Sequence, residues 1–422
     1  MCKRDTIVLL AAIIIALMLP WFAYAQEPKN TCVECHLQLD DELLAPAEAF
    51  ENDVHNRLGV LCVGCHGGDS AAEDADDAMS KQMGFIGAPS PLEIPKLCSK
   101  CHADPVYIKT FNPQLPTDQY SKYLTSMHGV KNLKGDQKVA QCASCHRAHD
   151  IRAANDPKSS VYAINIPATC AHCHADSVYM AGRGIPTNQM EQYASSVHGV
   201  ALLEKHDVGA PACNSCHGNH GAMPPGITSI ERVCGLCHAN NMTFFEESTH
   251  FEYFQGMNAR ACETCHSNHA IAKPSIEMLA GEHSVCLQCH DPKDGTGGIE
   301  AAMQMRMAID SLSGLIDDVN ARLDDADQKG LYVTNALFTL KDATQNLFEA
   351  KTAVHILNAD SVSGITLDGD KLAQQASVVA DGLLADYVVR RIGLAVSVVV
   401  LLFLALLIWI KVRRIETRQK LR

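Results

Sequence analysis

One stretch of the chain, residues 193–220, contains the pattern that decides the fold. Residues 193–199 read YASSVHG, and residues 213–220 read CNSCHGNH. The second segment holds the pattern C-x-x-C-H, with one further histidine before it and another after it, His198 and His220. The same pattern begins at nine cysteines along the chain: Cys32, Cys62, Cys98, Cys142, Cys170, Cys213, Cys234, Cys262 and Cys286.

C-x-x-C-H is the attachment pattern of c-type haem. Its two thiols can add to two vinyl groups of one porphyrin, and the histidine that follows becomes the proximal iron ligand. Structural zinc sites also use paired C-x-x-C motifs, but they do not need a histidine at one fixed position in all nine. Thioredoxin-like chemistry needs one reactive thiol pair in an α/β domain. The sequence therefore predicts nine covalently attached haem c groups.

The residues predicted to hold these haems follow directly from the motifs. The thioether bonds would be made by Cys32, Cys35, Cys62, Cys65, Cys98, Cys101, Cys142, Cys145, Cys170, Cys173, Cys213, Cys216, Cys234, Cys237, Cys262, Cys265, Cys286 and Cys289. The proximal iron ligands would be His36, His66, His102, His146, His174, His217, His238, His266 and His290.

The composition excludes two other classes of protein. Of the 19 cysteines in the 422-residue chain, every one except Cys2 belongs to a motif, so a disulfide-stabilised scaffold is excluded. The formal charge is −13, and no basic, aromatic-rich stretch suggests binding to nucleic acid. Aromatic residues make up only 5% of the chain, and we expect the porphyrins to supply the missing apolar surface.

The motifs occur in pairs that form an internal repeat. In the second repeat, a motif at Cys98 is followed by YLTSMHG at residues 123–129 and by CASCHRAH at residues 142–149. The third repeat has the same order, from Cys170 to His220, and a shorter fourth runs from Cys234 to His269. The first repeat is the most divergent, since Gly67-Gly68-Asp69 replaces the trailing histidine, and the motif at Cys286 stands alone.

The additional histidines of the repeats are candidate distal iron ligands. One lone histidine is usually a surface or core residue, but these recur in matched frames. The aromatic-x-x-Ser/Asp-x-His frame contains His55, His128, His198 and His250, and the C-H-x-x-His frame contains His149, His220 and His269. We expect His283 as an eighth ligand, because it precedes Cys286 by three residues. For the ninth we favour His355, with His172, His206 or an open iron as the alternatives.

The two ends of the chain indicate export and membrane attachment. Residues 1–25 resemble a secretory signal peptide, with a charged start, an apolar run and a small-x-small site before Gln26; an uncleaved anchor is the alternative. Residues 392–410 contain no charge and are long enough to span hydrocarbon as a helix. The basic tail at residues 411–422 predicts a cytoplasmic C-terminus, and therefore haems on the periplasmic side.

We therefore expect a mostly α-helical protein with extensive loops. A nonahaem domain would span residues 26–295, and a helical module would span residues 296–391. In that module, apolar residues from Ile309 to Leu323 follow one helical face, and a second helix follows Gly330. Residues 358–369 contain glycine and aspartate and read as a turn before a third helix from Lys371.

With these motifs, the chain resembles the membrane-anchored multihaem c-type cytochromes, in particular the quinone-linked group of the cytoplasmic membrane. The resemblance covers residues 32–290 and implies respiratory electron transport between a quinol-oxidising membrane subunit, such as a b-type cytochrome, and a soluble periplasmic cytochrome. The alternative is a multihaem redox enzyme, similar to hydroxylamine oxidoreductases or nitrite reductases, which needs one open iron. All nine attachment motifs are regular, so electron transfer is favoured and no catalytic residue is assigned.

Overall fold

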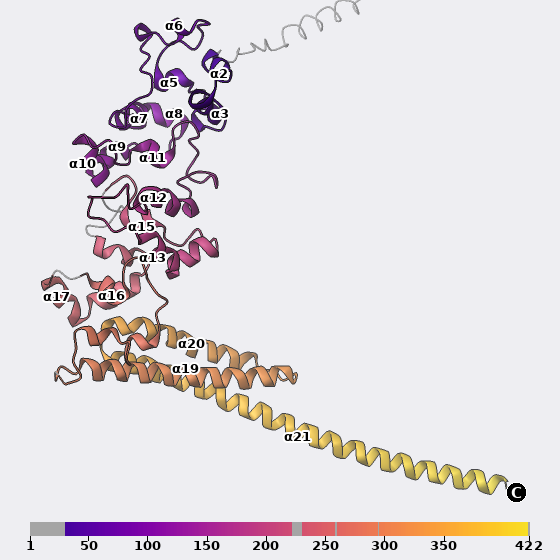
Figure 1. The fold of residues 1–422 in the computed structure, drawn as a ribbon. Coiled ribbons are helices and arrows are strands. Elements are labelled where there is room, and N and C mark those ends of the chain that lie inside the picture. The colour runs from indigo at the N-terminus through magenta and orange to yellow at the C-terminus, as the bar shows by residue number, and fades with distance from the viewer. Residues whose placement is uncertain (1–29, 222–229, 258–259, 294, 421–422) are drawn as a thin grey trace, which may run out of the picture. The chain divides into compact units, whose positions relative to one another are not determined.

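The computed structural model describes residues 30–221, 230–257, 260–293 and 295–420, and its architecture is helical (Figure 1). The predicted signal peptide and Cys2 lie outside the described residues. No β-strand occurs in the described part of the chain. The chain divides into two compact units, one made of residues 1–187 and 211–224 and the other of residues 188–210 and 225–422. The domain boundaries drawn from the sequence stay predictions.

The first unit consists of short helices joined by loops. Few apolar side chains are buried in it, among them Phe50, Ile108 and Met180. The helices that carry a C-x-x-C-H motif end at the histidine of that motif. With lengths of four to nine residues, the α-helices of this unit are too short to form long amphipathic faces. The α-helices are α2 (Thr31–His36), α3 (Leu44–Phe50), α4 (Val54–Arg57), α5 (Cys62–His66), α6 (Ala75–Ala78), α7 (Ile94–His102), α8 (Pro105–Phe111), α9 (Gln119–Thr125), α10 (Met127–Leu133), α11 (Cys142–His146), α12 (Ile166–His174) and α15 (Cys213–His217).

The second unit begins with segments of the same kind and continues into three long helices. The short segments that precede the long helices also carry the last three motifs. They are α13 (Gln189–Ser195), α14 (Val197–Gly199), η4 (Val200–Glu204), η5 (Ile230–Leu236), α16 (Ala239–Glu246), α17 (Thr249–Gly256), α18 (Ala261–His266), η6 (Ile276–Met278) and η7 (Val285–Gln288).

The long helices are α19 (Gly298–Gln328), α20 (Thr334–Ala353) and α21 (Ala359–Lys420), and they pack into a three-helix bundle. The face predicted for the first of them is confirmed: Ile309, Leu312 and Leu323 are fully buried against the other two helices. Each such side chain contributes about 1.5–3 kcal/mol by its removal from water. Alanines on α20 and α21 allow the helices to approach closely. The bundle therefore has a conventional apolar core.

The turn predicted at residues 358–369 is wrong, because α21 is continuous from Ala359. Asn358 begins the helix, and its side-chain oxygen accepts a hydrogen bond from the Ser361 N–H at 2.9 Å. Gly369 lies where helices meet: a Cβ there would lie 2.6 Å from Leu312 Cδ2. This glycine permits close helix packing instead of a turn.

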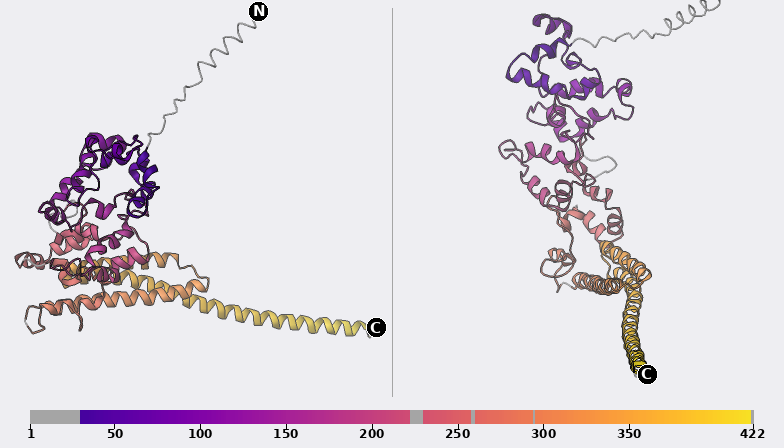
Figure 2. Two further views of the ribbon diagram at one scale, coloured as in Figure 1. Left: turned by 45° about the horizontal axis from the view of Figure 1, so that its top comes forward. Right: turned by 90° about the vertical axis from the view of Figure 1, so that its right-hand side faces the viewer.

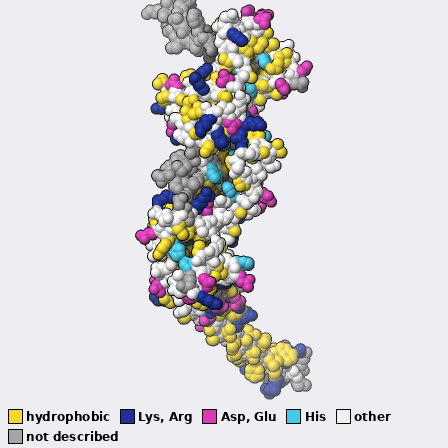
Figure 3. All heavy atoms as spheres, turned by 60° about the vertical axis from the view of Figure 1, so that its left-hand side comes forward, with side chains coloured by type: hydrophobic (Ala, Val, Ile, Leu, Met, Phe, Trp, Pro, Cys, Tyr) yellow, Lys and Arg dark blue, Asp and Glu magenta, His cyan; other side chains and the backbone are white. Residues whose placement is uncertain are grey.

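The second half of α21 runs past the ends of α19 and α20, as the views in Figure 2 agree. Residues 392–410 within it are exposed and apolar, and hydrophobic side chains cover this part of the helix in Figure 3. This helix is long and apolar enough to cross a membrane. Trp409 and the basic residues that follow it lie at the end of the apolar segment, as expected at a membrane interface.

Candidate functional site

Seven of the nine attachment motifs lie within a short α-helix, whereas those at Cys234 and Cys286 begin in the 3-10 segments η5 and η7. In α5, α11 and α15 the helix starts at the first cysteine and ends at the histidine. Residues separated by three and four positions lie on one side of a helix. The two sulfurs and the imidazole of a motif therefore face the same direction, as attachment to one porphyrin edge with the iron beside it requires. In α2, α7 and α12 the motif occupies the last turn of the helix.

The chain turns sharply after the second motif of each repeat. The residue that follows the proximal histidine has a positive φ in all four repeats: 68° at Gly67, 66° at Arg147, 76° at Gly218 and 65° at Ser267. This conformation stops the helix and is costly for a residue other than glycine. After this turn the backbone leaves the helix of the motif. A histidine of the C-H-x-x-His frame therefore does not lie on the same helix as the proximal histidine that it follows.

The serine of the Ser-x-His frame begins the helix that carries the distal histidine. Ser196 Oγ accepts a hydrogen bond from the Gly199 N–H at 3.0 Å and donates one to the Tyr193 carbonyl at 2.7 Å. The glycine is required by contact, since a Cβ at Gly199 would lie 1.9 Å from that carbonyl oxygen. Ser126 makes the same two hydrogen bonds in the second repeat. In these two repeats the serine thus caps the short helix and fixes the backbone position of the distal histidine.

Among the contacts described for this chain, seven proximal histidine rings each lie opposite the ring of one predicted distal histidine. The distances between ring centroids fall between 5.9 and 6.2 Å. The pairs are His55 with His102, His66 with His149, His128 with His174, His146 with His220, His198 with His238, His250 with His290, and His266 with His355.

This separation fits an iron atom between the two rings. Metal–imidazole bonds of about 2 Å on opposite sides of one ion place the ring centres about 6 Å apart. The angle between the ring planes varies from 8° to 89° while the distance stays constant. Two ligands of one atom behave in this way, because each ring can rotate about its bond to the metal. The residues present therefore fit haem iron with two histidine ligands.

The protonation state of the histidines also fits metal binding, which requires neutral imidazole. Burial favours the neutral form of a histidine and so lowers its pKa. Burial lowers the pKa of His102, His128, His146, His149, His174, His198, His220, His250 and His266. The second ring nitrogen is engaged in some cases: His66 Nδ1 lies 2.8 Å from the Gly87 carbonyl, to which it can donate.

The pairs follow a simple rule of connection. A histidine of the Ser-x-His frame faces the first proximal histidine of the next repeat or motif, as His55 faces His102. A histidine of the C-H-x-x-His frame faces the second proximal histidine of the repeat before, as His149 faces His66. Neighbouring repeats are joined by backbone as well, since the Val54 N–H donates to the Ile151 carbonyl at 2.8 Å. In each of these pairs, one repeat therefore supplies a histidine ring that lies opposite a proximal histidine of a neighbouring repeat or motif.

The sulfur atoms connect the motifs in the order of the sequence. The first cysteines of the two motifs in a repeat lie close enough for each thiol to shift the pKa of the other, namely Cys32 with Cys62, Cys98 with Cys142, Cys170 with Cys213, and Cys234 with Cys262. Between repeats, burial and the nearby thiol of Cys101 raise the pKa of Cys65, and Cys173 and Cys286 do the same for Cys145 and Cys265. Within each unit, the attachment edges of successive haems would therefore be neighbours.

The first repeat replaces the serine of the frame by Asp53, which is 1% exposed. Asp53 Oδ1 accepts from the His55 N–H at 2.8 Å and lies 2.9 Å from His55 Nδ1. Its other oxygen accepts from the Ile151 N–H at 2.8 Å. Burial raises the pKa of Asp53, but the hydrogen bonds from His55 and from the backbone outweigh it, so the net shift is downward and the carboxylate is ionised.

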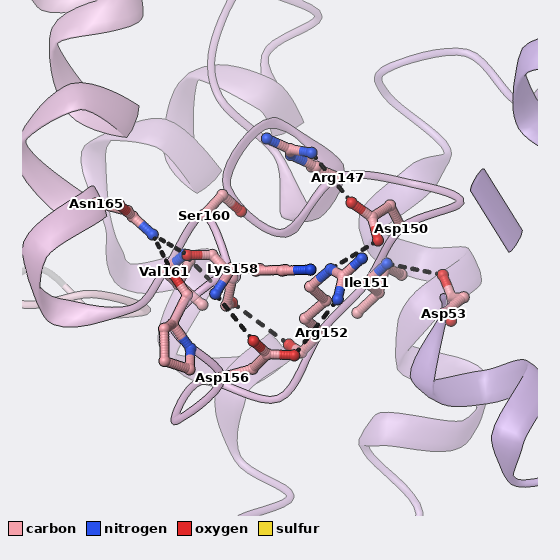
Figure 4. Close-up of polar contacts among 12 residues, drawn as sticks. Asp53, Arg147, Asp150, Ile151, Arg152, Asp156, Lys158, Ser160, Val161 and Asn165 are labelled. Atoms are coloured by element: carbon pink, nitrogen blue, oxygen red, sulfur yellow. Dashed lines mark hydrogen bonds and ion pairs between the residues drawn. The ribbon is translucent and has the colours of Figure 1, made fainter. Parts of the chain in front are cut away.

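The loop that reaches Asp53 is fixed by ion pairs, which Figure 4 shows. Arg152 contacts Asp150 at 2.8 Å and Asp156 at 3.5 Å, and Arg147 contacts Asp150 at 3.1 Å. Asn165 donates to two carbonyls of the same loop. This network holds the Ile151 N–H against the Asp53 carboxylate.

His355 lies at the end of α20, in the segment η8 (Val354–Ile356). Its ring faces His266 at 6.1 Å, and its Nδ1 can donate to the Thr352 carbonyl at 2.8 Å. The Asn241 amide of α16 lies 3.2 Å from the same nitrogen. The helical bundle therefore supplies one side of a haem site whose other side belongs to α18.

Among the described residues, the ring pairs do not include His36, His172, His206 or His283. His283 is exposed and lines a hollow of about 210 Å³ with Glu282 and Arg306. The ring opposite His290 is that of His250. His172 and His206 are exposed, and among the described residues no ring pair includes His36. The iron-ligand roles of all these histidines, His36, His217, His269 and His283 included, stay predictions.

Two family models match parts of the chain. One, described as cytochrome c3, matches residues 54–175, and the other, a doubled CXXCH motif, matches residues 255–295. Comparison with curated proteins and with solved structures found no match. The first matched region contains four complete motifs with the distal histidines that face three of them, and the second contains the last two motifs. With its repeated haem-attachment motifs and one helix able to span a membrane, this chain is a multihaem c-type cytochrome that binds haem c covalently.

Proposed function

We propose that this cytochrome carries nine haems and transfers electrons between a quinol-oxidising membrane partner and soluble periplasmic redox proteins. The observation that carries the proposal is the arrangement of the sites. Histidine pairs succeed one another in sequence order within each unit, and the sulfurs of successive motifs are neighbours. Haems with two histidine ligands have no vacant position for substrate, which suits electron transfer better than catalysis.

The proposed membrane orientation rests on the two ends of the chain. The leader at residues 1–25 would direct export, and α21 would then hold the haems at the outer surface of the cytoplasmic membrane. The tail after Trp409 is rich in lysine and arginine, which favours the cytoplasmic side. Arg390 and Arg391 precede the span, but the export signal supports the same orientation independently.

The need for a membrane partner follows from the composition of the span. Residues 392–410 contain neither histidine nor an ionisable residue, so this segment has no ligand for a membrane-embedded haem. A b-type cytochrome or another quinol-oxidising subunit beside α21 would supply the electrons. His355 supports this route, because it connects the membrane-anchored bundle to the site at His266.

The test uses the full chain purified in mild detergent. We expect a haem-b subunit to co-purify, and a menaquinol analogue to reduce the cytochrome rapidly only when that subunit is present. Intact mass should show nine haems on a chain that begins at Gln26. Rapid reduction of the isolated cytochrome by the quinol analogue would contradict the partner, and fewer haems would contradict the count.

One observation favours a second candidate function, that of a multihaem redox enzyme. Such an enzyme needs an iron with a vacant distal position. Among the described residues, the proximal ligand predicted at His36 has no histidine ring opposite it, in contrast to the other proximal histidines of α5, α7, α11 and α12. Turnover of a small substrate that requires the motif at Cys32 would favour this alternative.

A further inference from the structure

We infer that the haem iron held by Cys32, Cys35 and His36 has no histidine on its distal side and binds a small uncharged molecule there. The inference deepens the proposed function, on which it rests, because it assigns one haem of the electron-transfer array a binding role. It follows from the connection of the repeats, from the surroundings of α2 and from the charge of residues 30–52.

The rule of connection leaves the first motif without a donor. The first proximal histidine of a repeat receives its distal histidine from the repeat before, as His102 does from His55 and His174 does from His128. His36 is the first proximal histidine of the first repeat. Residues 1–35 contain neither an earlier repeat nor a histidine.

The histidines of the same unit are already engaged elsewhere. Each of the four distal-frame histidines of this unit faces another proximal ring, as the pairs of His55, His128, His149 and His220 show. His172 lies inside the attachment motif of α12, between its two cysteines, and its side chain is exposed. The distal-frame histidines of this unit therefore leave none to bind an iron opposite His36.

The proximal side of this site is nevertheless formed like the others. His36 Nδ1 lies 3.2 Å from the Leu43 carbonyl, to which it can donate, and this leaves Nε2 for the iron. Thr31 fixes the start of α2, since its N–H donates to the Ser70 carbonyl at 3.0 Å and its hydroxyl can donate to the Ala72 carbonyl at 2.7 Å. The proximal side of this site is thus prepared to hold haem.

The charge near the site selects the class of ligand. Residues 30–52 contain six acidic residues and no lysine or arginine: Glu34, Asp40, Asp41, Glu42, Glu48 and Glu51. The resulting negative potential disfavours an approaching anion. Leu37, Leu39 and Leu43 are 48%, 39% and 53% exposed and surround the motif with apolar surface. A small neutral molecule meets neither a charge penalty nor a loss of hydrogen bonds there.

The first experiment counts open irons in the full-length cytochrome in detergent. Carbon monoxide is titrated into the dithionite-reduced protein, and we expect saturation at about one molecule per chain. On the oxidised protein, neutral imidazole should bind more tightly than azide. No carbon monoxide binding would overturn the inference, and preferential binding of azide would overturn the assigned class of ligand.

The second experiment locates the open iron. His36→Ala keeps both thioether cysteines, so the haem stays attached, but the ligand opposite the carbon monoxide is lost. The infrared C–O stretching band should therefore shift in this variant. The matched control is His198→Ala, which should leave the original band in place and add a second carbon monoxide. An unshifted band in His36→Ala would place the open iron elsewhere and overturn the inference.

Film voltammetry separates failure of this inference from failure of the proposed function. If all haems exchange electrons reversibly and no carbon monoxide binds, electron transfer stands and the open site does not. If carbon monoxide binds but electrons do not pass between haems, the proposed function fails while the vacant position remains.

Discussion

The three-helix bundle and the motif-bearing residues 30–290 are both helical, but their interiors differ. The buried core cluster of the chain lies between Ala302 and Ala380, on α19, α20 and α21. In residues 30–290 the buried apolar side chains are scattered, with Leu202 as the largest that is fully covered. Helices as short as α5 or α11 are not stable alone. We therefore expect the secondary structure of the motif region to depend on a cofactor that supplies the apolar surface.

The largest effect should come from making the chain without haem. Residues 30–290 would lose their main source of apolar burial and unfold, while the bundle would keep its helices because its core is made of side chains. Limited proteolysis followed by mass spectrometry should leave one resistant fragment that begins near Gly298.

The haem-loaded chain is the control for this experiment and should resist the protease throughout residues 30–290. A resistant fragment of the haem-free chain that contained the motifs would contradict this prediction, because it would demonstrate a core in the motif region that does not need haem.

A substitution in the bundle should act through ordinary packing. Leu312 is fully buried, so Leu312→Ala should lower the free energy of unfolding of the bundle by about 2–5 kcal/mol. Met307 on the same helix is 60% exposed, and Met307→Ala should change it by less than about 0.5 kcal/mol. Thermal unfolding followed by circular dichroism measures the change in unfolding free energy for both variants. Equal changes would show that the bundle is not stabilised by a core of buried side chains.

The fold was predictable where a local pattern carries the information. The face of α19 follows from its periodicity, and the proximal histidines follow from the motif itself. The turn predicted before Lys371 was wrong, because glycine in sequence signals a turn and the close approach of two helices equally well. Only the packing of Gly369 against Leu312 distinguishes the two.

The candidate distal ligands were predictable as a set, but their partners were not. The repeat predicts His128 as a candidate ligand, yet nothing local indicates that it faces His174 in the following repeat. These pairs join positions dozens of residues apart, so the fold decides them. His283 was chosen because it is near Cys286 in sequence, whereas the ring opposite His290 belongs to His250.

His355 joins the two regions of the comparison, so its loss should affect both. His355→Ala should convert one haem to the high-spin state and should weaken the attachment of the bundle to the motif region, because the iron bond between α18 and η8 is lost. Electron paramagnetic resonance counts the high-spin irons, and proteolysis near residue 298 reports the attachment.

His172→Ala is the matched control, since this histidine is exposed and lies outside the ring pairs. His198→Ala should also create one high-spin haem but leave the proteolysis unchanged, because its ring faces His238 and not the bundle. A wild-type spectrum from His355→Ala would remove this residue from the ligands.

The smallest expected effect is on the potential of one haem in the motif region. It arises because the first repeat has Asp53 where the other repeats have a serine. The buried carboxylate beside His55 Nδ1 makes this imidazole a stronger donor, which stabilises oxidised iron and lowers the potential of the haem that it shares with His102. Asp53→Ser restores the residue of the other repeats and should raise that potential by about 60 mV, which corresponds to a tenfold change in equilibrium. Spectroelectrochemical titration should show the potential of one haem raised and the potentials of the others unchanged.

Ser126→Ala, which removes the helix cap without removing a charge, should cost about 1 kcal/mol of stability and leave the potentials in place. An unchanged potential in Asp53→Ser would mean that the carboxylate only caps α4, as the serines cap their helices, and the first repeat would then differ from the others in sequence but not in function.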